Sequence, residues 1–369
     1  MPRPIQAIIH HHSLQHNLAL ARKTIASDSQ LFAVVKANAY GHGIENVYPA
    51  FKTADGFALL DIDEAIRLRE LGWEKDILLL EGLFTEDDLV QCINHNLKFT
   101  VHSDHQLTWL TAYSGPAQFN IFLKMNSGMN RLGFKPKAYQ EAWHALSKLP
   151  HIQSITHMMH FSDADGERLG QDGTTYQMNL FQEVIKDLPG KCSLSNSAAL
   201  LRHQHDVTSD YIRAGILLYG SSPDYPKHSA KDWQLKPGMS LRTEIIAIQE
   251  IQENDSVGYG SQYIAKEFMK IGVVACGYAD GYQRISPSGT PILVNGKRTQ
   301  LIGRVSMDML AVDLTHIENA DIGSEVVLWG QSSCGALLSI DEVAEKSNTL
   351  GYELMCGVTA RVPFYIDKA

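Results

Sequence analysis

The sequence lacks the features that mark membrane proteins, disulfide-rich proteins and nucleic-acid-binding proteins. Its 369 residues contain no apolar run long enough to span a bilayer, and neither end reads as a signal peptide. The five cysteines are scattered, odd in number and never spaced as CxxC, which argues against a disulfide framework or a zinc cluster. The formal net charge is -9 and the sequence contains no basic tract, which argues against a nucleic-acid partner. We expect a cytoplasmic protein that acts on a small molecule, with no membrane or nucleic-acid partner and no metal.

One local composition stands out, the run His10, His11 and His12 with His16 close behind. A metal site of this kind normally draws on a carboxylate nearby, and none follows in this segment. We therefore interpret the run as the chain entering its first helix.

From residue 31 onward, short apolar runs alternate with amphipathic stretches, a pattern typical of repeated βα units. Helical patterns fill the gaps, as in the segment between Asp61, a candidate N-cap, and Gly72, a helix stop. The eight strand candidates are Leu31–Val35, Gly56–Leu60, Asp76–Leu80, Leu97–Val101, Gln118–Lys124, Ile152–His160, Lys191–Ser195 and Asp210–Arg213. Eight consecutive units predict an α/β fold with a closed (β/α)8 TIM barrel, and an open doubly wound sheet is the alternative.

The βα pattern ends in the segment Pro223–Pro237, where proline, serine and charged residues cluster. Beyond it come alternating runs at Leu241–Ile251, Lys270–Cys276, Pro291–Val305, Met309–Leu314 and Glu325–Trp329. The pair Asn295-Gly296 is a hairpin signal. We predict a barrel at residues 1–232 and a mostly-β C-terminal domain at residues 233–369, with residues 1–10 able to pack with the second domain.

Lys36 directly follows the apolar run Leu-Phe-Ala-Val-Val, and Gly41 and Gly43 then favour a turn. The lysine is therefore expected at the carboxyl end of the first barrel strand, where barrels bind their ligands. A lysine desolvated there can lose its proton and form a Schiff base with an aldehyde. Taken alone, a lysine at a strand end is more often an exposed surface residue.

The loops after strands seven and eight are suited to a phosphate. Ser197 offers a hydroxyl where a helix begins, and Gly215 lets the backbone approach an anion closely. Taken singly, each also fits an ordinary role, a helix cap for the serine and a turn for the glycine.

Five motifs, in the same order along the whole chain, resemble those of bacterial alanine racemase. They are Val-Val-Lys-Ala-Asn-Ala-Tyr-Gly-His-Gly around Lys36, Leu123–Gly133, Asn196–Ala198, Gly277–Tyr282 and Gly303–Asp308. The resemblance implies a barrel with a β-domain that binds pyridoxal 5'-phosphate (PLP), forms a homodimer with shared active sites, and interconverts L- and D-alanine.

The resemblance also implies two catalytic bases, one on each face of the substrate. Lys36, which holds the cofactor, serves one face, and Tyr259 reaches the other face from the partner subunit. A tyrosine with an ordinary pKa near 10 needs cationic or hydrogen-bonding help near neutrality, and His160 and Arg131 are the expected sources. Arg213 corresponds to the residue that faces the pyridine nitrogen, where a permanently protonated guanidinium donates a hydrogen bond without giving up its proton.

The remaining site residues follow from the same resemblance. Further cofactor contacts are expected from Tyr40, His160, Asn196, Ser197, Gly215, Ile216 and Tyr352. The substrate carboxylate is expected to meet Arg131 as its main cationic contact. Met307 and Asp308 match the loop of the partner subunit that contacts the carboxylate region, with Met307 acting through its backbone. Lys124 matches a lysine that is often carbamylated, and an unmodified lysine at a strand end is the alternative.

Two positions depart from the family pattern. Asn126 stands where the family often has aspartate. The local charge near Lys124 and Arg131 is therefore less negative than usual, which would suit a bound anion such as chloride. Ser193 stands where some members carry a histidine behind the pyridine-facing arginine, which leaves the support of Arg213 open.

Three other functions compete with this interpretation. A racemase of broader specificity fits the same motifs. A PLP barrel decarboxylase shares the strand-1 lysine, but its glycine-triplet phosphate loop is missing here. A non-catalytic PLP carrier would need only a barrel, and the β-rich segment that bears Tyr259 and Met307 argues against it.

Overall fold

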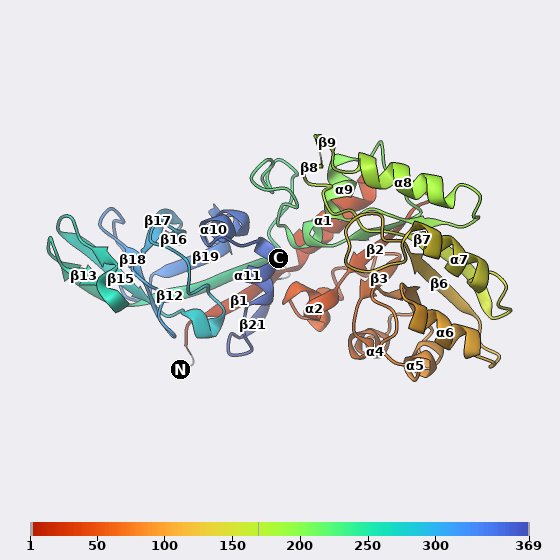
Figure 1. Ribbon diagram of the computed structural model, residues 1–369. Coiled ribbons are helices and arrows are strands. Elements are labelled where there is room, and N and C mark those ends of the chain that lie inside the picture. Colours follow the sequence, from red (N-terminus) through yellow and green to blue (C-terminus); the bar gives the residue numbers. More distant parts are fainter. Residues whose placement is uncertain (1–2, 169, 368–369) are drawn as a thin grey trace. The chain divides into compact units, whose positions relative to one another are not determined.

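The computed structural model describes residues 3–168 and 170–367 and contains two compact units. One unit holds the chain up to His16, the segment Tyr40–Val47 and the chain from Tyr219 onward. The other holds Asn17–Ala39 and Tyr48–Leu218. Each unit is built on one large sheet (Figure 1). The domain boundary expected between residues 232 and 233 stays a prediction.

The second unit is a barrel of eight parallel strands in the order β10-β7-β6-β5-β4-β3-β2-β11. The strands are β2 Gln30–Val34, β3 Gly56–Leu59, β4 Asp76–Leu79, β5 Lys98–Val101, β6 Phe119–Lys124, β7 Ile152–Met158, β10 Cys192–Ser193 and β11 Tyr211–Ala214. Backbone hydrogen bonds from Asp210 N to Cys192 O (2.9 Å) and from Arg213 N to Ser195 O (3.1 Å) join the first and last strands. The predicted (β/α)8 barrel is therefore confirmed, and the open sheet is excluded.

Helices surround this sheet on its outer side (Figure 1). They are α1 His11–Thr24, α4 Ile62–Glu70, α5 Asp88–Asn94, α6 Asp104–Ala112, α7 Pro136–Leu146, α8 Thr175–Ile185 and α9 Ser197–Arg202, and the two-residue strands β8 Glu167–Arg168 and β9 Gln171–Asp172 form a hairpin before α8. The predicted start and stop of α4 are confirmed, because Asp61 occupies the N-cap position and Gly72 has a φ of 89° just past the end. The Asp61 side chain makes no capping hydrogen bond, so Asp63 and Glu64 in the first turn supply the charge that favours this helix end.

The first unit contains a nine-stranded sheet in the order β20-β19-β16-β17-β18-β15-β12-β1-β21. Its strands are β1 Gln6–His10, β12 Met239–Ile251, β15 Met269–Val274, β16 Pro291–Val294, β17 Lys297–Ile302, β18 Leu310–Asp313, β19 Glu325–Gln331, β20 Leu337–Leu338 and β21 Phe364–Asp367. Asn295 and Gly296 have φ values of 49° and 74°, so the predicted hairpin is confirmed with the geometry of a type I′ turn. The mostly-β character of the C-terminal third is confirmed as well.

Smaller elements complete this unit. They are α3 Ile44–Val47, the strand pair β13 Ser256–Val257 and β14 Tyr263–Ile264, the 3-10 helices η2 Tyr259–Ser261 and η3 Tyr278–Asp280, and the helices α10 Ile340–Lys346 and α11 Gly351–Cys356. Two further short helices, α2 Lys36–Tyr40 and η1 Ile216–Tyr219, follow barrel strands β2 and β11.

The histidine run lies at the end of a strand that the sequence did not predict. β1 pairs antiparallel with β12 and parallel with β21, and it ends at His10. The His10 ring bonds Ser240 Oγ (2.7 Å) and Asp367 Oδ2 (3.0 Å), while His11 opens α1 as expected. Across residues 3–168 and 170–367, no group of three His, Cys, Asp or Glu side chains could hold a metal ion. Over the same residues, no helix has the length and apolar content needed to cross a bilayer.

Candidate active site

Lys36 begins a turn of unusual backbone directly after β2. Ala37, Asn38, Ala39 and Tyr40 have φ values of 54°, 51°, 56° and 51°, so four successive non-glycine residues are left-handed. The turn expected at Gly41 and Gly43 therefore already starts at Ala37. Because a left-handed residue with a Cβ is disfavoured by roughly 1–2 kcal/mol, such strain persists only where surrounding contacts fix it, as at functional sites.

Four cationic side chains of the barrel unit lie within electrostatic reach of one another. Burial, followed by the charges of Arg213, Arg131 and Lys36, lowers the pKa of Lys124 to about 8, while Glu81 opposes this shift. Lys124 is itself buried at the end of β6. Such a concentration of positive charge, in a chain that is negative overall, favours an anionic ligand. We call these four side chains the cation cluster.

Arg213 is a buried cation without an anionic partner among the described residues. Its Nη1 donates to Ser193 Oγ (2.5 Å), and its Nη2 donates to Met159 O (2.8 Å) and Leu194 O (3.2 Å). Burial lowers its pKa to about 10, so it stays protonated at neutral pH. Within the described chain Nε donates to no acceptor and Nη1 donates only to Ser193, which leaves N–H groups for a ligand. Ser193 thus supplies the support that the sequence left open.

His160 is a neutral group in this setting. Burial, followed by the charges of Arg213, Lys124 and Arg131, holds its pKa well below the ordinary value of 6.5. Its Nδ1 lies 3.4 Å from Arg213 Nη2, and because an arginine only donates, Nδ1 accepts and the ring proton sits on Nε2. His160 can therefore offer a hydrogen bond but no positive charge. Of the two residues expected to assist Tyr259, only Arg131 is then a cation.

The loop that carries Arg131 is shaped by the residue that departs from the family pattern. Asn126 Oδ1 accepts from the backbone N–H groups of Gly128 (3.2 Å) and Asn130 (3.0 Å). Lys124, Asn126, Arg131 and His160 line one small cavity. An aspartate could accept the same two hydrogen bonds, so the departure changes the charge of this cavity more than its shape.

The loops after β10 and β11 meet at Ser197. Its Oγ accepts from the backbone N–H of Gly215 (3.0 Å) and of Leu217 (3.4 Å). The Ser197 hydroxyl and the backbone N–H groups of Gly215 and Leu217 therefore converge, which is a suitable arrangement for phosphate oxygens. Asn196 also caps α9, because its Oδ1 accepts from Ala199 N (2.9 Å).

Two tyrosines named from the sequence belong to the β-rich unit. The rings of Tyr40 and Tyr352 lie 5.9 Å apart between centroids. Burial raises the pKa of Tyr40 far above its ordinary value, so its hydroxyl stays protonated and can donate to an anion.

Tyr259 and Met307 are strongly exposed large side chains of the β-rich unit, at 72% and 53%. Tyr259 stands between Gly258 and Gly260, which both have a φ of 74°, so the backbone turns sharply on either side of it. Arg304 lies beside this turn, since a Cβ on Gly260 would be 3.0 Å from Arg304 Nη1. Both exposed side chains are available to another molecule.

A residue that the sequence did not single out supports the barrel site. Gln177, fully buried on α8, donates from Nε2 to His160 O (3.0 Å) and Ser127 Oγ (2.9 Å), and its Oε1 accepts from Ser162 N (2.8 Å). It thereby fixes the loop after β7. One polar residue on an otherwise amphipathic helix carries no local signal of such a role.

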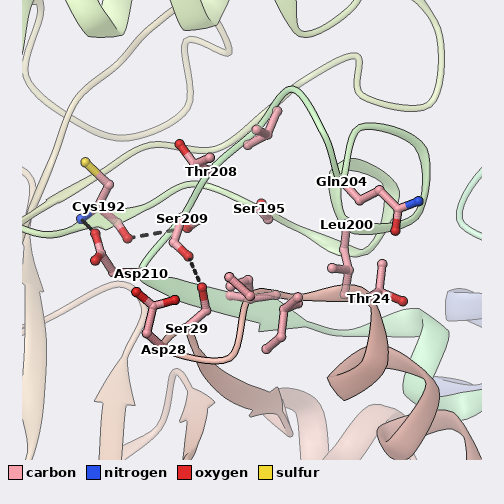
Figure 2. Close-up of a pocket in the computed structure, with 14 residues that line it drawn as sticks. Thr24, Asp28, Ser29, Cys192, Ser195, Leu200, Gln204, Thr208, Ser209 and Asp210 are labelled. Atoms are coloured by element: carbon pink, nitrogen blue, oxygen red, sulfur yellow. Dashed lines mark hydrogen bonds between the residues drawn. The ribbon is translucent and has the colours of Figure 1, made fainter.

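A separate cavity of about 350 Å³ lies at the opposite, amino-terminal ends of the strands (Figure 2). Ser29 before β2, Cys192 in β10 and Asp210 before β11 line it. Ser209 bridges its wall, because it accepts from Ser29 Oγ through its carbonyl and donates from Oγ to Cys192 O (Figure 2). Barrel enzymes bind their substrates at the carboxyl ends of the strands. We therefore interpret these hydrogen bonds at the amino-terminal ends as stabilising the barrel.

The fold and the cation cluster define a (β/α)8-barrel enzyme for a small anionic substrate. Family models described as the N-terminal and C-terminal domains of alanine racemase match residues 9–223 and 238–366. The chain therefore belongs to the alanine racemase family, as its motifs implied, and it is an isomerase.

Individual relatives agree with this assignment over their full length. The alanine racemase of Acinetobacter baumannii (strain SDF) is 64% identical over 99% of both chains. The crystal structure of biosynthetic alanine racemase from Pseudomonas aeruginosa superposes with a TM-score of 0.93 at 42% identity, covering 99% of both chains. That of alanine racemase from Bacillus anthracis with bound L-Ala-P gives a TM-score of 0.85 at 29% identity, covering 100% of this chain and 96% of the other.

Proposed function

We propose that this protein interconverts L-alanine and D-alanine with pyridoxal phosphate as its cofactor. The observation that carries the proposal is the cation cluster at the carboxyl ends of the barrel strands, in a chain 64% identical to an alanine racemase. Both the cofactor phosphate and the alanine carboxylate are anions, so the cluster offers charge to each.

The residues present fit the cofactor. Arg213 is a buried cation with an N–H to spare, and Ser197, Gly215 and Ile216 offer a hydroxyl and backbone N–H groups. We infer that Lys36 holds the cofactor through Nζ, that Arg213 donates to its ring nitrogen, and that Ser197 and its neighbours bind the phosphate. By resemblance, the hydroxyls of Tyr40 and Tyr352 donate to that phosphate as well, and His160 and Asn196 remain proposed cofactor contacts. When bound, the cofactor supplies an electron sink for the charge left on Cα by proton removal.

The chain's own residues then have to move one proton on each face of the substrate. Lys36 Nζ would take or give the proton on one face, and Tyr259 Oη of the partner subunit would do so on the other. Arg131 would bind the substrate carboxylate, with the backbone N–H of the partner's Met307 and with the partner's Asp308 beside it. Because Arg213 does not release its proton, it holds the ring nitrogen in one protonation state throughout.

Lys124 is suited to carbamylation. Only a neutral amine attacks carbon dioxide, and a pKa of about 8 leaves a substantial neutral fraction at physiological pH. The carbamate would carry a negative charge beside Arg131 and Arg213, so the modification would neutralise part of the cation cluster.

Assembly and location are further parts of the proposal. A homodimer with shared sites is supported by the exposure of Tyr259 and Met307, which would be covered by a partner. A cytoplasmic location is supported by the five cysteines, all of which are free thiols.

Kinetics with a panel of amino acids test the proposal. Purified protein loaded with pyridoxal phosphate should racemise alanine far faster than serine, leucine or arginine. Comparable rates on the larger amino acids would favour the broad-specificity racemase. A protein that binds the cofactor and racemises nothing would be the non-catalytic carrier.

A further inference from the structure

Asp280 is a fully buried carboxylate in the Gly277–Tyr282 motif, and the catalytic residues proposed above do not involve it. Its Oδ1 accepts from Arg3 Nη1 (2.7 Å) and forms an ion pair with Arg361 Nε (3.0 Å), and its Oδ2 accepts from Gly277 N (2.9 Å). A buried charge persists only when it is paired in this way. Arg3 lies near the start of the chain, and Asp280 and Arg361 lie 277 and 358 positions further on, so their meeting is a property of the fold.

The same two arginines also hold Asp308. Arg3 Nη2 donates to the backbone carbonyl of Asp308 (2.6 Å), and Arg361 Nη2 donates to its Oδ1 (2.7 Å). Each guanidinium therefore spans Asp280 and Asp308 with different nitrogens, which a lysine with its single nitrogen cannot do. Asp308 is partly exposed, whereas Asp280 beneath it is not.

The backbone of the turn at residues 277–280 fixes Met307, the residue before Asp308. Tyr278 N donates to Ser306 O (3.0 Å), and Ala279 N donates to Met307 O (2.9 Å). Gly277 is required here, because a Cβ at that position would lie 2.3 Å from Met307 O. With its carbonyl engaged and its side chain exposed, Met307 presents a backbone N–H that donates to nothing else in the described chain.

We propose that Asp280, Arg3 and Arg361 are positioning residues that hold the 306–308 loop, so that the Met307 N–H reaches the substrate carboxylate in the site of the partner subunit. This inference rests on the proposed racemase function and on the substrate role of Met307. It makes an arginine at the third residue of the chain part of the substrate site.

The exposed arginines allow a test without disrupting the buried carboxylate. Arg3→Ala removes one clamp, and Arg361→Lys keeps the charge but loses the bridge. Arg298→Ala is the matched control, because Arg298 is also a half-exposed arginine of the β-rich unit, paired with Glu342 away from this loop. Each protein, loaded with cofactor, is assayed with L-alanine and D-alanine at a concentration where the wild type has its full oligomeric mass.

We expect KM to rise roughly tenfold in Arg3→Ala and in Arg361→Lys, the equivalent of one charge-assisted hydrogen bond, with kcat little changed. The rise should be shared by both enantiomers, and the visible absorbance of the bound cofactor and the oligomeric mass should match wild type. Arg298→Ala should keep wild-type kinetics. The inference would be overturned by a KM within about twofold of wild type in Arg3→Ala or a wild-type KM in Arg361→Lys. It would also be overturned if activity fell only in step with the oligomeric mass. A wild-type protein that fails to racemise alanine would instead remove the proposed function.

Discussion

Lys124 offers a direct test of the cation cluster, because removing its charge should stabilise the protein. Lowering its pKa from an ordinary 10.5 to about 8 means that the charged form is disfavoured in the fold by about 3 kcal/mol, at 1.36 kcal/mol for each unit of pKa. Methionine has a similar length and no charge. Lys124→Met should therefore raise the free energy of unfolding of the cofactor-free protein by about 3 kcal/mol at pH 7.

The sign of the pH dependence follows from proton binding. Between about pH 8 and pH 10.5 the unfolded lysine is protonated while the folded one is not, so the unfolded state binds more protons. The stability of the wild type should therefore rise through this window relative to that of Lys124→Met. Below about pH 8 the difference between the two proteins should be fully present, and above pH 10.5 it should vanish.

Chemical denaturation in carbon-dioxide-free buffer, at several pH values, measures this difference. Lys137→Met is the control, because Lys137 is 92% exposed and its substitution should change stability by less than about 0.5 kcal/mol. Added bicarbonate should stabilise the wild type and leave Lys124→Met unchanged if the lysine is carbamylated. A Lys124→Met protein less stable than wild type at pH 7 would refute the reasoning about the cluster.

Three further variants test other parts of the site and fold. Tyr259→Phe should bind cofactor normally and lose racemisation in both directions, while one enantiomer still exchanges its α-proton in D2O; full racemase activity would exclude the tyrosine as a base. Ser193→Ala should lower the free energy of unfolding by about 1.5–3 kcal/mol, because a buried N–H of Arg213 loses its acceptor. The control Ser195→Ala should change this free energy little, and equal shifts of the melting temperature in the two variants would contradict the prediction. Gly41→Ala should lower the unfolding free energy by more than about 3 kcal/mol, because its Cβ would lie 2.1 Å from Met355 O at a φ of 77°, and an unchanged denaturation midpoint would argue against that contact.

The barrel was predictable because each strand is a local signal. A run such as Leu31–Val35 is apolar throughout, as expected for a strand buried on both faces, and the observed β2 differs from it by one residue at each end. β1 and β21 were not predictable in this way. Their pairing joins residues at opposite ends of the sequence, and the polar histidines at the end of β1 break the apolar pattern.

Arg213 was singled out only through the resemblance of its motif to the family. The position of Lys36 at the end of β2 was predictable, because the apolar run before it is a local signal. The left-handed turn after Lys36 was not, because alanine, asparagine and tyrosine carry no local preference for four successive positive φ values. The neutral state of His160 and the ion pairs of Asp280 with Arg3 and Arg361 were not predictable from the sequence either. Both depend on charges that only the folded chain brings together.

The most direct test of the central claim follows purified protein with L-alanine in D2O, with and without added pyridoxal phosphate. The account predicts D-alanine that carries deuterium at Cα, formed at a rate that depends on the cofactor. Protein that shows the absorbance of bound cofactor but neither exchanges the α-proton nor forms D-alanine would contradict it.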